Sequence, residues 1–298
     1  MQKLGQHFLK NAEVLQKIVS ALALADNDRV IEIGPGHGEL TAPLVRAAQG
    51  KRCEIFCIEK DHALIGELEQ FAAQENATAA GGTGDEVSAG ARVTIIEGDA
   101  LKLLPETIAL FPHGASYKIV GNIPYYITGK LLRTISELEH KPERTVLLIQ
   151  KEVAERICAA PPDMNRLAAS VQFWADAEIV AHVPRKDFSP VPEVDSTVIG
   201  LNTKLSAEKS APGFAKHGDA TRTLDRNLDP ALYYRAVRAI FAQPRKTLLN
   251  NLSAAAEKTA KKNDIAARIE KIGINPDARP QDLSIDQIAS IARLGLWS

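Results

Sequence analysis

The residue types best suited to chemistry lie in the stretch GNIPYYIT, at 121–128, directly after an apolar run. An amide (Asn122), a proline (Pro124) and two aromatic rings (Tyr125 and Tyr126) stand where a strand is expected to turn into a helix. An amide oxygen accepts hydrogen bonds, proline fixes φ, and an aromatic face stacks on a flat ring. Together they suit a site that grips a planar molecule carrying an amine.

A glycine-rich run follows the first predicted strand. EIGPGHG, at 32–38, continues from that strand and opens a helix, which is where a doubly wound sheet binds its ligand. Gly34 and Gly36 let the backbone turn sharply and come close to the ligand. Such a loop alone is weak evidence, because nicotinamide binding uses a similar one.

Two acidic residues end the next two predicted strands. Glu59 is placed to accept hydrogen bonds from a ribose, and Asp99 to reach an adenine amine, with GDA forming the turn. Taken singly, each could equally be a helix N-cap or a solvated turn residue. The series of glycine loop, two acids and NIPY after four successive strands follows the order of the class I methyltransferase fold that binds S-adenosylmethionine. Chance is a poor explanation for all four in register.

The pattern along the chain predicts alternating strands and helices, which indicates a doubly wound, mostly parallel α/β sheet. Strands are predicted at 29–33, 53–59, 92–99, 116–122 and 144–150, and an antiparallel pair at 177–183 and 196–204. Helices are predicted at 12–24, 39–48, 62–73, 130–139 and 151–160. The Ala- and Gly-rich segment 73–90 is interpreted as a surface loop.

A domain boundary is predicted near residue 206. The polar, aperiodic segment 206–230 is interpreted as a linker that joins a catalytic domain, 1–205, to a small helical domain, 231–298. In the helical domain we expect helices over 231–243, 244–260, 266–273 and 285–295.

Composition sets broad limits on the class of protein. The 298 residues are 45% hydrophobic and 24% charged, with a net charge of −1, which is an ordinary globular balance. No run of about 18 apolar residues is present, and the N-terminus lacks a signal-peptide core. Three scattered cysteines (Cys53, Cys57 and Cys158) predict buried thiols, no disulfide framework and no metal site. We therefore expect a cytoplasmic protein that makes no use of a membrane.

NIPY also resembles the catalytic motif of methyltransferases that modify exocyclic amines. The lone pair of an adenine N6 is delocalised into the ring, so the amine is a poor nucleophile. The Asn122 side-chain oxygen and a main-chain carbonyl, most simply that of Ile123, can hold its two hydrogens and localise the lone pair. Pro124 biases Ile123 toward an extended conformation, and Tyr125 can stack on a flipped base. The alternative is a plain proline turn with two core tyrosines.

The whole chain is similar to the KsgA family, the bacterial small-subunit ribosomal RNA adenine N6,N6-dimethyltransferases. The resemblance rests on GQHFLK (5–10), VIEIGPGHGELT (30–41), IEKD (58–61), GDAL (98–101), GNIPYYIT (121–128), LLIQKEVAERI (147–157), FSPVPEVDSTV (188–198) and FAQPRKTLLNNL (241–252). It implies S-adenosylmethionine-dependent transfer of four methyl groups, two to each of two adjacent adenosines near the 3′ end of small-subunit ribosomal RNA.

The resemblance also assigns residues. It places His7, Leu9, Gly34, Gly36, Glu59, Asp99 and Asn122 in the cofactor pocket, and it gives catalytic roles to Asn122, Ile123, Pro124, Tyr125 and Phe188. Phe188 matches an aromatic that covers the target base, although packing at a strand-to-strand turn is nearly as good an interpretation. The chain departs from the family in a short basic N-terminal arm, Pro244 for a usual Arg, and Glu193 for a common Lys.

The predicted RNA partner requires a basic surface. The segment 233–262 carries seven Lys or Arg against one acid, Glu257. We expect Arg235 and Arg238 on one helix face, and Arg245 and Lys246 at the start of the next helix, to bind RNA. A solvated helical surface is the alternative. We expect the partner to be the RNA of an assembling small subunit and the protein to be a monomer.

Three rival functions stay open at this point. A related resistance methyltransferase of large-subunit RNA would share the first-domain motifs, but the helical motifs favour the KsgA branch. A non-catalytic assembly or RNA-binding factor would not need the intact Asn122, Glu59 and Asp99, although an assembly role beside catalysis fits. A nicotinamide dehydrogenase leaves NIPYY unexplained.

Overall fold

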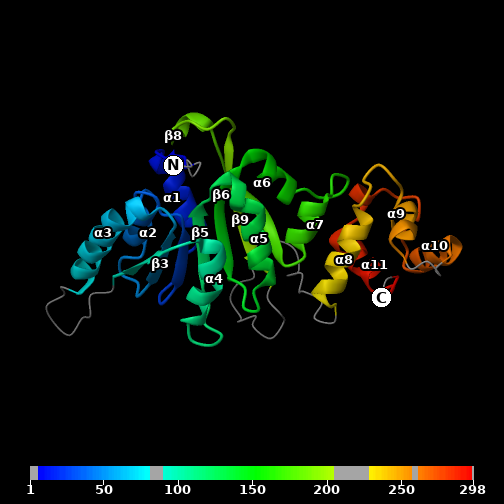
Figure 1. The fold of residues 1–298 in the computed structure, drawn as a ribbon, viewed down its shortest axis with the longest axis horizontal. Coiled ribbons are helices and arrows are strands. Elements are labelled where there is room, and N and C mark those ends of the chain that lie inside the picture. Colours follow the sequence, from blue (N-terminus) through cyan, green and yellow to red (C-terminus); the bar gives the residue numbers. More distant parts are fainter. Residues whose placement is uncertain (1–5, 81–89, 205–227, 257–260, 297–298) are drawn as a thin grey trace. The chain divides into compact units, whose positions relative to one another are not determined.

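A computed structural model describes residues 6–80, 90–204, 228–256 and 261–296 (Figure 1). The chain forms two compact units. One comprises Met1–Ala154 and Glu178–Thr203, and the other comprises Glu155–Ala177 and Lys204–Ser298. The boundary between Thr203 and Lys204 lies close to the predicted division near 206, whereas the segment 155–177, predicted in the catalytic domain, belongs to the second unit.

The first unit is organised by a seven-stranded sheet with the order β4-β3-β2-β5-β6-β9-β7. The pairs β4–β3, β3–β2, β2–β5 and β5–β6 are parallel, and β9 is antiparallel to β6. The predicted doubly wound class with an antiparallel closing strand is thus confirmed. The strands are β2 (Arg29–Ile33), β3 (Glu54–Glu59), β4 (Arg92–Glu97), β5 (Lys118–Asn122), β6 (Arg144–Gln150), β7 (Ala175–Val183) and β9 (Ser196–Thr203).

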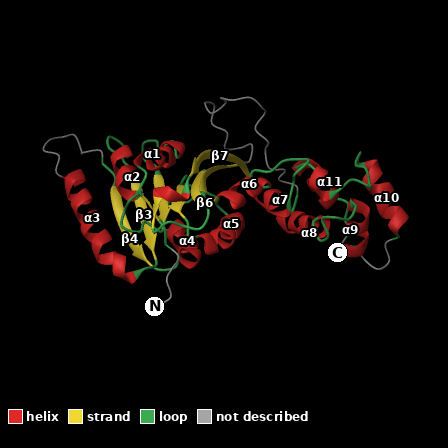
Figure 2. Cartoon of the chain, turned by 90° about the horizontal axis from the view of Figure 1, so that it is seen from above, coloured by secondary structure: helices red, strands yellow, loops and turns green. Residues whose placement is uncertain are grey.

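Helices cover both faces of this sheet. Seen from above in Figure 2, α1 and α2 lie on one side of the strands, and α4 and α5 lie on the other. Strands such as β2 are therefore buried on both faces, which is why Val30 and Ile31 are both fully buried. The helices are α1 (Ala12–Ala21), α2 (Thr41–Ala47), α3 (His62–Ala80), α4 (Ala100–Ala109), α5 (Thr128–Glu137) and α6 (Lys151–Ile157).

The predicted surface loop at 73–90 is wrong over its first part, where α3 continues to Ala80. Two causes extend the helix. Alanine has the highest helix propensity, and Asn76 exchanges hydrogen bonds of 2.8 and 2.9 Å with the backbone N–H and C=O of Val93. β4 is an edge strand, so no further strand pairs with its outer side. The Asn76 side chain therefore bonds the backbone N–H and C=O of Val93 that would otherwise lack a partner in the sheet. Residues 81–89 lie outside the described part.

Several short elements were not predicted. Helix α4 follows Asp99, whose side chain accepts a hydrogen bond from Leu101 N, so GDA begins a helix and is not only a turn. A two-stranded antiparallel sheet joins β1 (Phe8–Leu9) to β8 (Phe188–Ser189). Neither strand is long enough to show an alternating pattern, so only tertiary contact reveals the pair.

The second unit contains helices α7 (Arg166–Gln172), α8 (Pro230–Ile240), α9 (Leu248–Ala255), α10 (Lys262–Lys271) and α11 (Ile285–Ala292). Helix α7 was not predicted. It joins this unit because Phe173, directly after it, stacks on Tyr233 of α8 with ring centroids 3.9 Å apart, and Tyr233 Oη donates to Ala169 O at 2.9 Å. Most of the predicted linker over 206–230, namely 206–227, lies outside the described residues. Within the described ranges, no helix is long and apolar enough to cross a membrane.

A buried carboxyl group in β2 makes stability depend on pH. Glu32 is 1% exposed, and the Cys57 thiol donates to its Oε2 at 3.5 Å. Burial raises the pKa of Glu32 from 4.5 to about 7. The folded protein therefore holds this proton between about pH 4.5 and 7 while the unfolded chain releases it, so stability falls as pH rises through that window.

We expect Glu32→Gln to stabilise the protein more at pH 8 than at pH 5, by about 2–3 kcal/mol, because the glutamine has no proton to lose. Urea unfolding at both pH values measures this difference. Glu69→Gln, at an exposed position of α3, is the matched control and should change both values equally. A Glu32→Gln effect that is equal at pH 5 and pH 8 would contradict the explanation.

Candidate active site

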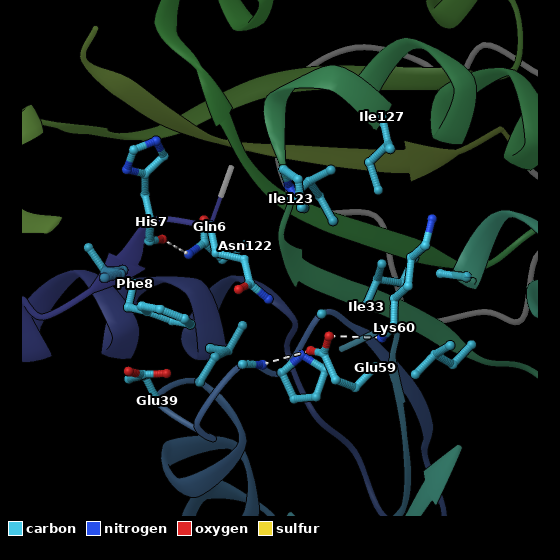
Figure 3. Close-up of a pocket in the computed structure, with 18 of the residues that line it drawn as sticks. Gln6, His7, Phe8, Ile33, Glu39, Glu59, Lys60, Asn122, Ile123 and Ile127 are labelled. Carbon is cyan, nitrogen blue, oxygen red and sulfur yellow. Dashed lines mark hydrogen bonds between the residues drawn. The ribbon is translucent and has the colours of Figure 1, made fainter. Parts of the chain in front are cut away.

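A cavity lies at the carboxyl ends of β2, β3 and β5, where the predicted ligand site falls (Figure 3). Its lining includes ten of the eleven catalytic or cofactor-binding residues predicted from the sequence: His7, Leu9, Gly34, Gly36, Glu59, Asp99, Asn122, Ile123, Pro124 and Tyr125. Tyr126 of the same motif also lines it, as do Gln6, Phe8, Glu39 and Lys60, for which no role was predicted from the sequence. Across the described residues, no group of three or more His, Cys, Asp or Glu could hold a metal ion.

Two glycines shape the loop after β2, with room beside Gly34 and close packing at Gly36. Gly34 and Gly36 have φ of +68° and +63°, in the region that other residues rarely adopt. A side chain at Gly36 would place its Cβ 2.8 Å from the Phe8 ring. The backbone N–H of Gly34 donates to Ile58 O at 3.0 Å, which ties the loop to β3. Any other residue at Gly34 or Gly36 would have a strained backbone, and one at Gly36 would also clash with Phe8. We call this loop the glycine cradle.

Glu59 organises the cavity floor from the end of β3. Its side chain is 3% exposed, so the alternative of a solvated turn residue is wrong. Oε2 accepts a hydrogen bond from Gly36 N at 3.1 Å, and Oε1 accepts from Lys60 N and Asp61 N, each at 2.8 Å. Dashed lines at Glu59 in Figure 3 mark its contacts to the glycine loop and to Lys60. One carboxylate therefore fixes the glycine loop against the end of β3.

Asp99 has two roles in the structure. Oδ1 accepts from Leu101 N at 3.0 Å, so the helix N-cap considered from the sequence is present. Oδ2 pairs with Lys60 Nζ at 3.0 Å. The hydrogen bond from Lys60 lowers the pKa of the Asp99 carboxyl, and the carboxyl stays charged at neutral pH. Asp99 remains at the cavity wall while it caps α4.

The Asn122 amide has a fixed orientation. Its Nδ2 donates to the backbone carbonyl of His7 at 2.8 Å (Figure 3), which leaves Oδ1 on the opposite side of the amide group from that contact. Gly121, one residue earlier, permits this strand end. A Cβ there would come within 2.6 Å of Ile33 O on the neighbouring strand. The amide thus presents an acceptor at the edge of the cavity, and the N-terminal segment 6–9 holds it in place.

The remaining residues of the motif form a rigid turn. Pro124 has φ −53°, as predicted for its ring, and the turn continues into a short 3₁₀ helix, η1 (Tyr125–Ile127). Tyr125 is partly buried and stacks on His7 with centroids 5.9 Å apart. Its hydroxyl shares a 2.8 Å hydrogen bond with Ser196 Oγ. Burial raises the pKa of this hydroxyl, so it stays protonated at neutral pH. Sequence reasoning gave no signal for the Ser196 contact.

Phe188 is the one predicted catalytic residue that the structure does not bring to the cavity. It is 4% exposed, lies in β8, and belongs to a hydrophobic cluster that also contains Leu9, its neighbour in register. This is the packing interpretation that the sequence left open. Burying this large apolar ring against β1 stabilises the fold more than leaving the ring exposed at the edge of the cavity would.

The predicted RNA-binding cations are all exposed. Arg235 and Arg238 lie on α8, and none of the four predicted cations has an acidic partner within 4 Å in the described part of the chain. Arg245 and Lys246 do not open a helix as predicted, because α9 begins at Leu248, capped by Thr247. They lie in the turn before it.

Asn251 holds that turn, and sequence reasoning missed it. The side chain is 3% exposed. Its Oδ1 accepts from Gln243 N at 2.9 Å, and its Nδ2 donates to the carbonyls of Gln243, Lys246 and Thr247 at 3.0, 3.3 and 3.2 Å. A buried amide with four backbone contacts fixes the loop that exposes Arg245 and Lys246.

The sheet order, the glycine cradle after β2 and the acid after β3 define a class I S-adenosylmethionine-dependent methyltransferase with an additional helical unit. Residues 1–213 match the family model described as ribosomal RNA adenine dimethylase. The chain belongs to this family, and it is an enzyme that methylates ribosomal RNA adenine with S-adenosylmethionine as cofactor. The interpretations as a nicotinamide dehydrogenase or a purely non-catalytic factor are therefore excluded.

Relatives in several bacteria carry the name ribosomal RNA small subunit methyltransferase A. The protein of Dehalococcoides mccartyi strain 195 is 35% identical over 95% of this chain and 84% of its own length. That of Geobacillus thermodenitrificans is 35% identical over 98% and 89%. Among solved structures, a dimethyladenosine transferase from Plasmodium falciparum has a TM-score of 0.70 at 23% identity, covering 96% of both chains. The 23S rRNA methyltransferase ErmE has a TM-score of 0.67 at 20% identity, over 96% of this chain and 98% of its own. At these identities the two structures support the fold alone.

Proposed function

We propose that this enzyme dimethylates the N6 amines of two adjacent adenosines near the 3′ end of small-subunit ribosomal RNA. The observation that carries the proposal is the oriented amide of Asn122 at the edge of a glycine-cradled cavity. The names of the relatives at 34–35% identity, which specify the small ribosomal subunit, support the choice of RNA. The match along nearly the whole chain includes the helical motifs, which favours this branch over large-subunit enzymes.

The cavity suits S-adenosylmethionine, which supplies an electrophilic methyl group when it is bound. The space beside Gly34 admits a ligand against the backbone, while the Phe8 ring packs beside Gly36. Glu59 is a charged acceptor suited to a ribose hydroxyl pair, and Asp99 is an acceptor suited to an adenine amine. His7, Leu9 and Asn122 complete the proposed cofactor-binding set.

The chain's own residues position the target amine. Asn122 Oδ1 accepts one hydrogen of the adenine N6 and the carbonyl of Ile123 accepts the other, which draws the nitrogen toward tetrahedral geometry. Because Nδ2 is held by His7, the amide needs little reorganisation when the amine arrives. Tyr125 stacks on the flipped base. The aryl ammonium product is acidic enough to lose its proton to water or to these acceptors, so no strong base is required. Phe188 has no part in this proposal, since it is buried against β1.

The setting of the reaction is proposed on the same grounds. We infer a cytoplasmic, monomeric enzyme that acts on RNA within an assembling small ribosomal subunit and serves ribosome biogenesis. The test is methyl transfer from labelled cofactor to three substrates: purified unmethylated small subunits, the same RNA without proteins, and large subunits. Preference for large subunits would contradict the choice of RNA, and equal rates on naked RNA would contradict the need for an assembling subunit. Calorimetric titration with S-adenosylmethionine and with NAD separates cofactor binding from RNA recognition.

We expect the exposed cations of the helical unit to bind the RNA backbone. Charge reversal of Arg235, Arg245 and Lys246 to Glu should weaken binding to small subunits without changing S-adenosylmethionine affinity. The slope of log K against log[salt] should flatten by roughly 0.7–0.9 for each phosphate that the protein no longer neutralises. Binding measured across a salt series checks this.

A matched triple variant provides the control. Helix α10 of the same unit carries three cations that the proposal does not assign to RNA, namely Lys262, Arg268 and Lys271. Reversing the charge of these three residues should change the slope of log K against log[salt] less than reversing Arg235, Arg245 and Lys246 does. If both triple variants bind alike, the cations around α8 and α9 are a solvated surface only, and the RNA is bound elsewhere.

A further inference from the structure

The strongest unassigned feature is a lysine at the cavity wall. Lys60 follows Glu59 directly, lines the cavity, and extends its side chain away from Glu59 toward Ile127 (Figure 3). Its ammonium is 3.0 Å from Oδ2 of Asp99. No role for Lys60 is predicted from the sequence, yet its ammonium contacts Asp99, the acceptor proposed for the adenine amine of the cofactor.

Both oxygens of Asp99 are engaged in this arrangement. Oδ1 takes the N–H of Leu101 and caps α4, while Oδ2 takes the Lys60 ammonium. An adenine amine that approaches Asp99 therefore meets a competing donor at the oxygen that does not serve the cap. The hydrogen bond to Asp99 is also the main cause that raises the pKa of Lys60, so the ammonium stays charged at neutral pH.

We propose that Lys60 is an internal competitor for Asp99, and that it sets the affinity and selectivity of the adenine subsite by holding this carboxylate until the exocyclic amine displaces it. The inference rests on the proposed role of Asp99 in cofactor binding. Lys60 thereby lowers the preference of the subsite for rings that carry an amine, because such a ring must displace the ammonium from Asp99 while a ring without an amine leaves the pair intact.

Exposure decides how strong this competition is. The Lys60 and Asp99 side chains are 53% and 31% exposed. Ion pairs at such sites are weak, so the ammonium can leave at low cost and take up water. The corresponding change in ligand affinity is about two- to fivefold. A pair of this strength tunes binding and does not block it.

The test compares Lys60→Met with the unmodified protein by calorimetric titration of three probes: S-adenosylmethionine, adenosine, and purine riboside, which lacks the amine. Methionine keeps an unbranched apolar stem and removes the charge. We expect the dissociation constants of S-adenosylmethionine and adenosine to fall by about two- to fivefold, and that of purine riboside to stay unchanged. High salt should narrow the difference, because it screens the pair in the unmodified protein.

Lys102→Met is the matched control. Lys102 is exposed on α4 and does not line the cavity. Its charge lowers the pKa of Asp99 less than the Lys60 hydrogen bond does. Its removal should leave all three dissociation constants unchanged. An equal gain from Lys102→Met would overturn the proposal, because general charge would then explain the effect.

Further outcomes separate this proposal from the proposed cofactor site. If Lys60→Met binds adenosine with unchanged or weaker affinity, Lys60 does not compete for Asp99. The Asp99→Asn variant then tests separately whether Asp99 binds the adenine. A gain for S-adenosylmethionine without one for adenosine also overturns it, since repulsion of the sulfonium would be the cause. If Asp99→Asn leaves adenosine binding unchanged, the adenine role of Asp99 fails and the inference with it. If the unmodified protein does not bind S-adenosylmethionine, the cofactor site itself is wrong.

Discussion

Replacing Asn122 by alanine is expected to lower methyl transfer by about 10²–10³-fold, while S-adenosylmethionine affinity stays within a few-fold of the unmodified protein. The magnitude follows by analogy with the loss of one preorganised donor from an oxyanion hole. The structure supplies the reason for preorganisation, because the 2.8 Å bond from Nδ2 to His7 O fixes which side of the amide carries the acceptor. Single-turnover transfer to small subunits and cofactor titration measure the two quantities separately.

Asn122→Asp separates the acceptor from its orientation. Aspartate keeps an oxygen for the amine but replaces the N–H donor with a second oxygen beside the His7 carbonyl. We expect transfer to fall in this variant as well, because repulsion from that carbonyl turns the side chain. Near-normal turnover by Asn122→Ala would end the proposed role of the amide. Normal turnover by Asn122→Asp alone would show that the contact to His7 is dispensable.

Glu59→Ala should weaken S-adenosylmethionine binding by about 10- to 100-fold. Hydrogen bonds to a charged group contribute roughly 1.5–3 kcal/mol, and 1.4 kcal/mol is a factor of ten in affinity. Two effects add in this variant. The ribose would lose its charged acceptor, and the N–H groups of Gly36, Lys60 and Asp61 would lose the carboxylate that holds them. Calorimetric titration of the cofactor measures the sum.

Glu59→Gln distinguishes these two effects. Glutamine keeps the size and one acceptor oxygen, so one side of the contact to the glycine loop or to the β3 end is retained while the charge is lost. We expect an affinity between those of the unmodified protein and Glu59→Ala, together with a smaller loss of thermal stability. An unchanged dissociation constant in Glu59→Ala would assign Glu59 to structure alone.

The sheet could be predicted from the sequence because its strands are buried on both faces. β2 and β6 were predicted with their observed bounds, 29–33 and 144–150, since short, mainly apolar runs that begin with an arginine leave little choice. The site could be located for the same reason. Parallel strands carry their carboxyl ends to one edge, so Gly34, Glu59 and Asn122 had to converge there.

Other features depended on contacts between distant parts of the chain, which no local pattern reveals. The extension of α3 depends on Asn76 bonding β4. The assignment of α7 to the second unit depends on Phe173 stacking on Tyr233, far along the chain. Phe188 was assigned a substrate role from its motif, but pairing of β8 with β1 buries its ring. The ion pair of Lys60 with Asp99 joins two strand ends and could not be predicted from either one.

The most direct test of the central claim is a map of the methyl groups that the enzyme adds. Unmethylated small subunits are incubated with the enzyme and labelled S-adenosylmethionine, and the modified nucleotides are then identified by mass spectrometry. The Asn122→Ala variant serves as the control. We expect N6,N6-dimethyladenosine at two adjacent positions near the 3′ end of the RNA, and none above background with the variant. Methyl groups at another nucleotide, a single monomethylated adenosine as the end product, or equal labelling by the variant would contradict the account.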